Sequence, residues 1–134
     1  MLYHHLTFEN SGASGSISVS TTSTTYNTSS DYRLKENVDY DFNALDRVAQ
    51  LKPARFNFIA DETNTLVDGF LAHEVQDIDP EAITGEKDAV DSEGNPDYQG
   101  IDQSKLVPLL TKAIQEQQTI IDDLKTRIET LENA

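Results

Sequence analysis

The chain has 134 residues, 37% hydrophobic and 25% charged, which is enough for one domain or for one small domain with appendages. Its net charge of −14, from 24 acidic and 10 basic residues, argues against a nucleic-acid partner, because a phosphate backbone is bound by clustered Lys and Arg. With no cysteine there is no disulfide framework or thiolate metal site, and no apolar run approaches the ~20 residues of a membrane span.

The charge is unevenly distributed along the chain. Residues 1–29 contain one charged residue, Glu9, whereas all the other acids and all the bases follow from Ser30 onward. This break predicts two segments with different roles. Residues 10–30 have the Ser, Thr, Gly and Asn composition of a flexible linker. Their apolar residues also alternate with small polar ones, which fits strands of a β-fibre that needs partner chains.

Residues 31–100 have the pattern of a small α+β unit. Leu45, Val48 and Ala49 share one face of a predicted helix, which Pro53 brings to an end.

A β-hairpin is predicted next, from two alternating runs at 55–59 and 66–72 that flank a turn. A short helix at 73–78 and a protruding acidic loop at 85–100 follow. No metal site and no cofactor are expected. The acidic loop lacks the residue order of a calcium loop, and His4-His5 is a terminal pair without further ligands. The start of the chain also lacks the basic flank and apolar stretch of a signal peptide.

The strongest periodic signal covers residues 104–132. Residues of one helical stripe follow one another at alternating intervals of three and four positions, which is the heptad repeat of a coiled coil. Val or Ile occupies every a position of the heptad, and Leu occupies every d position but one. So narrow a stripe suits a coiled coil better than a globular core, and the chain should not be a monomer. Periodicity alone does not decide between dimer and trimer, although β-branched a with Leu at d leans towards two strands. The seam consists of Val107, Leu110, Ile114, Gln117, Ile121, Leu124, Ile128 and Leu131, with Gln117 as the polar residue that would fix register.

Ser30 and Lys35 lie where the Ser/Thr-rich tract meets the charged part of the chain. A serine needs a base to become a nucleophile, and a neutral lysine can serve. In a helix, five residues turn by ~500°, which would place Ser30 and Lys35 on different faces. In a strand, residues an odd number of positions apart point to opposite faces. Either the chain bends, or Lys35 comes from a neighbouring subunit. Without further evidence, the segment would be a turn capped by Ser30 or Asp31, with Arg33 and Lys35 solvated.

The motif Ser-Asp-Tyr-Arg-Leu-Lys-Glu-Asn-Val, at 30–38, resembles the opening of a known domain. It is similar to the intramolecular chaperone of phage endosialidases, tail spikes and tail fibres, a family of self-cleaving serine peptidases. The resemblance continues through 51–56, 69–75, 80–81 and 106–110. His73 departs from the family pattern, where Gln is expected.

The resemblance implies a small α+β chaperone domain at 30–103. A C-terminal helix at 104–134 would then form a parallel trimeric coiled coil. Residues 1–29 would be the end of an upstream fibre or spike segment. The nucleophile would be Ser30, the base Lys35 and the bond cut Ser29–Ser30. Asp31 and Arg33 are candidate supporting residues, with Arg33 as a cation that could favour a neutral lysine.

The implied function is to drive trimerisation and folding of the upstream fibre and then to cut itself off. Its partners would be two further copies of the chain and the upstream domain, with assembly in the host bacterial cytoplasm. A cut made before trimerisation would detach the chaperone from an unfinished fibre, so we expect cleavage to follow assembly. The dyad should therefore be incomplete in a single chain, which agrees with the spacing of Ser30 and Lys35. A non-catalytic trimeric stalk, as in adhesins, is the alternative function.

Overall fold

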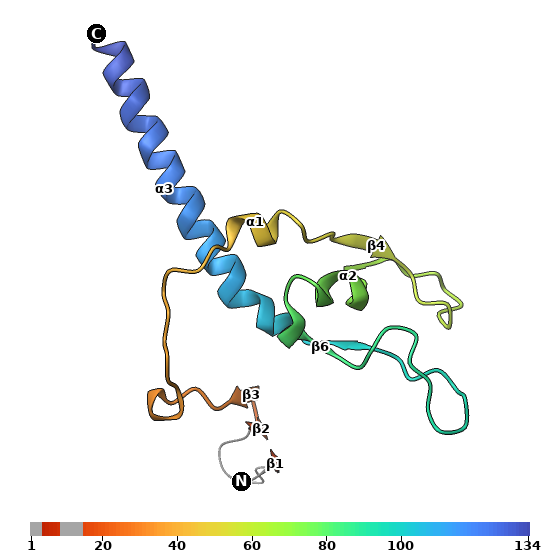
Figure 1. The fold of residues 1–134 in the computed structure, drawn as a ribbon. Coiled ribbons are helices and arrows are strands. Elements are labelled where there is room, and N and C mark those ends of the chain that lie inside the picture. Colours follow the sequence, from red (N-terminus) through yellow and green to blue (C-terminus); the bar gives the residue numbers. More distant parts are fainter. Residues whose placement is uncertain (1–3, 9–14) are drawn as a thin grey trace. The chain divides into compact units, whose positions relative to one another are not determined.

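The computed structural model describes residues 4–8 and 15–134, with side chains from residue 15 onward. The chain divides into two compact units, Met1–Tyr40 and Asp41–Ala134. Figure 1 shows the elements of each unit along the chain. The side chains of His4 and His5, considered above as metal ligands, lie outside the described residues.

The first unit contains an antiparallel three-stranded sheet in the order β1-β2-β3. The strands are β1 (His4–Phe8), β2 (Gly15–Val19) and β3 (Thr24–Thr28). Gly15 pairs with Thr28, and a Cβ at Gly15 would lie 2.6 Å from the carbonyl oxygen of Asn27, so only glycine fits there. Residues 15–28 thus form a β-hairpin and not a linker. Residues 10–14 of the tract lie outside the described part.

The second unit mixes short helices and hairpins with one long helix. Its strands form two antiparallel pairs, β4 (Ala54–Phe56) with β5 (Val67–Gly69) and β6 (Ile83–Thr84) with β7 (Gly100–Ile101). Its helices are α1 (Leu45–Val48), α2 (Ala72–Gln76) and α3 (Leu106–Glu132), with 3-10 turns η2 (Pro80–Ala82) and η3 (Gln103–Lys105). The predicted α+β class, the hairpin, the short helix and the long C-terminal helix are confirmed. No helix in the described part of the chain is long and apolar enough to cross a membrane.

The core of the second unit is small and is built on the first turns of α3. Leu109 and Ala113 of α3 pack with Ala44, and Leu106 packs with Val75 and Ala82. These three α3 residues are spaced by three and four, so they form one helical face. That face is distinct from the a and d seam, which leaves the seam residues outside this core.

The helix predicted before Pro53 is shorter than its pattern suggested: α1 has only four residues. Ala44, at its N-terminus, is fully buried and carries no capping side chain. The carboxylate of Glu116 on α3 accepts hydrogen bonds from the backbone N–H groups of Ala44 at 3.0 Å and Leu45 at 2.7 Å. A carboxylate from the far end of the sequence therefore fixes where α1 begins.

Candidate functional site

The chain bends sharply between Ser30 and Lys35. A single 3-10 turn, η1 (Tyr32–Leu34), lies between the extended residues Asp31 and Lys35. Lys35 Nζ donates a hydrogen bond to Ser30 Oγ over 2.8 Å. The bend accounts for a contact that neither a helix nor a strand would give at a separation of five residues.

The contact forms within one chain, so the expectation of a dyad left incomplete by its spacing is wrong. The reason is the tight winding of the 3-10 helix, three residues per turn, flanked here by extended residues on both sides. A neighbouring subunit is not needed to supply the lysine. The catalytic role of the two residues stays a prediction.

Asp31 holds the turn from its N-terminal side. Its carboxylate accepts hydrogen bonds from the backbone N–H of Arg33 at 2.9 Å and from the guanidinium at 2.9 and 2.8 Å. The hydrogen bonds from the Arg33 side chain, and then from its backbone, lower the pKa of Asp31. The capping role considered for Asp31 is confirmed. The guanidinium of Arg33 is thus paired with Asp31 at the surface, and its supporting role in catalysis stays a prediction.

The bond between Ser29 and Ser30 directly follows β3 and precedes η1. Ser29, Ser30 and Lys35 are all exposed to solvent. The hydroxyl of Ser30 belongs to the residue after this bond, so it can approach the carbonyl of Ser29 through its own backbone. In the single chain this bond and the two side chains are therefore accessible to water.

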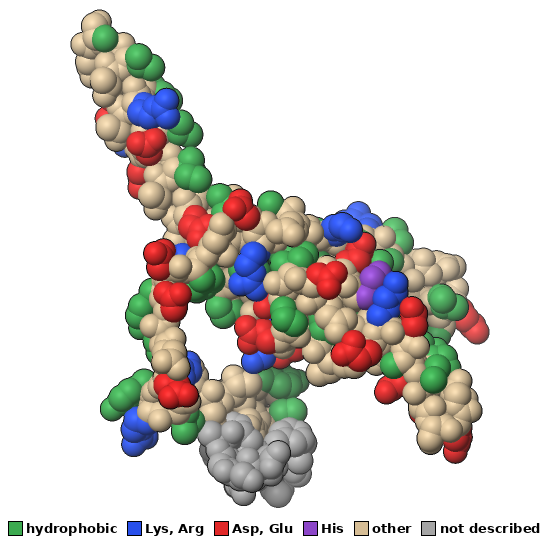
Figure 2. All heavy atoms as spheres, viewed as in Figure 1, with side chains coloured by type: hydrophobic (Ala, Val, Ile, Leu, Met, Phe, Trp, Pro, Cys, Tyr) green, Lys and Arg blue, Asp and Glu red, His purple; other side chains and the backbone are tan. Residues whose placement is uncertain are grey.

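The heptad seam of α3 is exposed along its whole length. Its apolar members range from 41% exposed at Leu110 to 76% at Leu131, and Gln117 is exposed too. Figure 2 shows hydrophobic side chains following one another along the outer part of this helix. Exposed apolar stripes are typical of interaction surfaces. The oligomeric state stays a prediction.

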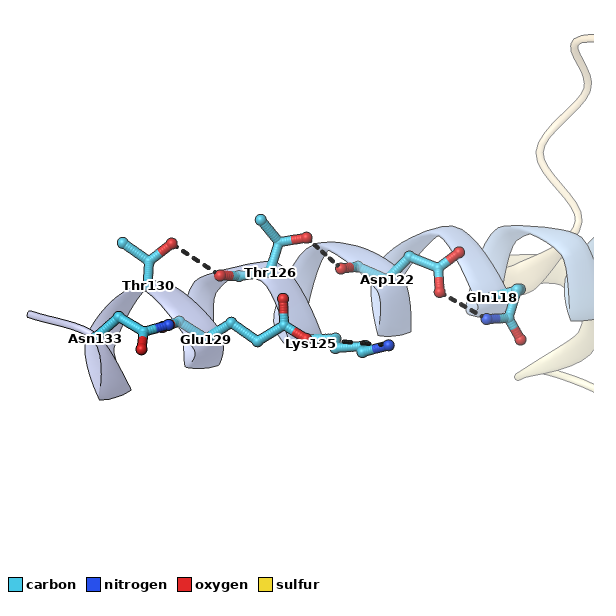
Figure 3. Close-up of polar contacts among 7 residues, drawn as sticks. All are labelled: Gln118, Asp122, Lys125, Thr126, Glu129, Thr130 and Asn133. Atoms are coloured by element: carbon cyan, nitrogen blue, oxygen red, sulfur yellow. Dashed lines mark hydrogen bonds and ion pairs between the residues drawn. The ribbon is translucent and has the colours of Figure 1, made fainter.

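Polar side chains of α3 interact with one another outside the seam. Gln118 Nε2 donates to Asp122 Oδ1 over 2.9 Å, and Lys125 lies 4.0 Å from Glu129. Figure 3 shows these contacts together with those of Thr126, Thr130 and Asn133 to carbonyls one turn back. All of them belong to b, c, e or f positions of the heptad, so the a and d positions carry none of them.

One buried carboxylate lies in the second unit, beside a cavity of about 230 Å³. Asp79 is 3% exposed, and its Oδ1 is 3.3 Å from Nη2 of Arg47, which also donates to the carbonyl of Ile78 at 2.8 Å. Burial raises the pKa of Asp79, while the charge of Arg47 opposes the rise. Among the described residues, no group of three or more His, Cys, Asp or Glu could hold a metal ion.

The fold and the site define a class: a small mixed α/β domain with a serine–lysine contact at its start and a long helix with an exposed apolar stripe. Residues 30–84 match the peptidase S74 family, described as "Chaperone of endosialidase", which supports the resemblance found in the sequence. A search of curated proteins found no match. The family indicates a chaperone role in the folding of phage tail proteins and, by its name, a peptidase-like domain.

The family match begins at Ser30, the residue after the bond expected to be cut, and includes Lys35. It ends at Thr84, so the acidic loop and α3 lie outside it. Glu116, which joins α3 to α1, was missed in the sequence. The signal was indirect: α1 starts at an alanine, and its N–H groups had to find an acceptor elsewhere.

Proposed function

We propose that the chain is a C-terminal intramolecular chaperone that cuts itself from an upstream phage tail fibre or spike at Ser29–Ser30. The observation that carries the proposal is the 2.8 Å hydrogen bond from Lys35 Nζ to Ser30 Oγ. It lies at the first residues of a family match described as a chaperone and named as a peptidase. Ser30 is the nucleophile and Lys35 the base.

The first step is an N-to-O acyl shift. Neutral Lys35 takes the proton of Ser30 Oγ as this oxygen attacks the carbonyl carbon of Ser29. The C–N bond then breaks, and the proton passes from Lys35 to the departing amine of Ser30. The product is an ester that joins the carbonyl of Ser29 to Ser30 Oγ, with the backbone cut at that point.

Water completes the reaction by hydrolysing the ester. The upstream segment leaves with a carboxylate at Ser29, and the chaperone fragment starts with the amine and hydroxyl of Ser30. The sheet β1–β2–β3 therefore departs with the upstream product. The reaction is a single turnover and needs no cofactor.

Assembly supplies what the exposed dyad lacks. A lysine accepts a proton only when neutral, and removal of water favours that form. The proposed trimer, held by the exposed seam of α3, brings neighbouring chains close enough to exclude water from Ser30 and Lys35. Cutting then follows folding, and the finished fibre is kinetically trapped because its covalent template has gone. We place this assembly in the cytoplasm of the host bacterium.

The proposal is tested by the intact mass of the purified chain, incubated with and without hydroxylamine. We expect a fragment that starts at Ser30 and, with hydroxylamine, an upstream fragment ending in a hydroxamate at Ser29, because the amine intercepts the ester. If only the intact chain is found, the non-catalytic stalk is the better function. A fragment without hydroxamate would remove the ester step but keep the cut.

A further inference from the structure

We infer that Asp31 is a positioning residue for self-cleavage, because its carboxylate caps the turn that carries Lys35 to Ser30. This inference rests on the proposed function. The hydrogen bonds of the Asp31 carboxylate come from Arg33, within the turn, and not from Ser30 or Lys35. Its Oδ1 accepts from the backbone N–H of Arg33 at 2.9 Å, inside the turn between the two dyad residues.

The turn has little else to hold it. Two backbone hydrogen bonds close it, from Leu34 N to Asp31 O and from Lys35 N to Tyr32 O, both 3.1 Å. None of its residues is buried, and Tyr32 and Leu34 are 81% and 60% exposed. Packing therefore does not fix the turn, and the ordering of a long lysine side chain costs conformational entropy. The hydrogen bond from the Arg33 N–H to the Asp31 carboxylate is a third hydrogen bond that stabilises the turn.

Asp31 makes an ion pair and an N-cap hydrogen bond, and the two contacts contribute differently to the stability of the turn. The ion pair with Arg33 is exposed, with 42% of the Asp31 side chain and 73% of the Arg33 side chain accessible, and exposed pairs contribute little. Loss of an N-cap acceptor changes the population of a capped turn by about 2- to 30-fold. The cap, not the charge, should therefore position Lys35.

The two contacts are separated by substitution. Asp31→Asn and Asp31→Ser keep an acceptor for the N–H of Arg33 but lose the charge, whereas Asp31→Ala loses both. Arg33→Ala keeps the backbone N–H and loses only the ion pair. Asp61→Ala is the matched control, since Asp61 accepts from the N–H of Thr63 at 2.9 Å with the same two-residue separation, in the second unit.

The experiment measures the rate at which the fragment starting at Ser30 appears, per assembled molecule, as a function of pH. We expect Asp31→Ala to slow cleavage about tenfold at every pH, with the midpoint of the pH profile unchanged. Asp31→Asn, Asp31→Ser and Arg33→Ala should stay within about threefold of the wild type. Asp61→Ala should cut like the wild type. If Asp31 acted through its charge, or if its loss merely destabilised the protein, we would not expect this combination. The combination is a pH profile of cleavage with an unchanged midpoint and a rate restored by Asp31→Asn.

Two results would overturn the inference. One is an Asp31→Ala variant that cuts at the wild-type rate; the other is an Asp31→Asn variant as slow as Asp31→Ala, which would assign the effect to charge. Failure of the proposed function looks different. In that case the wild type does not cut, or Ser30→Ala still does, whatever stands at position 31.

Discussion

Ser30 and Lys35 form a contact that their spacing in sequence did not predict. The polar segment Asp31-Tyr32-Arg33-Leu34 folds into a 3-10 turn under a carboxylate cap, and the turn brings hydroxyl and amine to 2.8 Å. The capping interpretation of Asp31 and the dyad interpretation of Ser30 and Lys35 are thus compatible. One local structure accounts for both.

At Ser30, replacement by alanine should abolish cleavage and leave the fold unchanged. The residue is exposed, so the substitution removes a hydroxyl without emptying any part of the core. The measurement is the intact mass after prolonged incubation, with circular dichroism and sedimentation as controls for folding and assembly. A fragment that still starts at residue 30 would show that another group is the nucleophile.

At Lys35, both alanine and arginine should fail to support cleavage. Removal of a general base typically costs about 10²- to 10⁴-fold in rate, and a guanidinium does not give up its proton at usable pH. The rate of fragment formation measures the loss. Lys52→Ala, which removes another exposed lysine but lies in the second unit, is the control and should cut normally.

Asp79 should have a pH effect on stability opposite to that of the capping carboxylates. Its pKa is raised in the folded state, so the folded state binds the proton more tightly and gains stability as pH falls towards the ordinary value of 3.8. Asp61, Asp91 and Asp102 have lowered pKa values, and their contributions are lost as pH falls below 3.8.

Asp79→Asn removes the stability that Asp79 adds as the pH falls. Relative to the wild type, this variant should therefore lose stability on acidification from pH 7 to pH 4. Free energies of unfolding in urea at a series of pH values provide the comparison, at one protein concentration because assembly shifts apparent stability. A difference between variant and wild type that is constant with pH would contradict the raised pKa.

Between elements, Glu116 is the link that holds α1 against α3. Glu116→Ala would leave the N–H groups of Ala44 and Leu45 without this acceptor, and Ala44 is fully buried. We expect a loss of about 1–3 kcal/mol in the free energy of unfolding, measured in urea. Glu129→Ala on the same helix is the control, since its side chain is 59% exposed and its partner Lys125 is 4.0 Å away. That variant should stay within about 0.5 kcal/mol.

The seam of α3 should not tolerate a charge. In an oligomer, Ile121→Asp places a carboxylate from each chain in one layer, and an uncompensated buried charge costs about 3–5 kcal/mol. The dissociation constant should rise about 100-fold or more, measured by sedimentation equilibrium. Gln115→Glu, an added charge outside the seam, should not change assembly. A wild-type chain that is monomeric at micromolar concentration would remove the coiled coil from the account.

The elements that could be predicted are those with local signals. The heptads of 104–132 identified α3, and alternation around a polar turn identified the β4–β5 hairpin. The start of α1 could not be predicted, because it depends on an acceptor 71–72 residues further along the chain. The identities of Ser30 and Lys35 came from the resemblance. The sequence left open whether the chain bends to join them or a neighbouring subunit supplies Lys35, because a 3-10 turn has no periodic signature.

For the whole molecule, we expect assembly to control the chemistry. The dyad is formed in one chain but remains exposed, so shielding from water, not the supply of a missing residue, is what the neighbouring chains would add. This replaces the simpler idea of a dyad split between subunits. It also predicts that a change far from Ser30 can stop cleavage.

The most direct test is to follow cleavage and oligomeric state together in Leu124→Asp, a seam variant that leaves Ser30 and Lys35 unchanged. Wild-type and variant chains are separated by size, and each fraction is incubated and analysed by intact mass. We expect a fragment starting at Ser30 from the wild-type trimer and only the full chain from the monomeric variant. Efficient cutting in the demonstrably monomeric variant would contradict it and leave a protease that acts independently of the coiled coil.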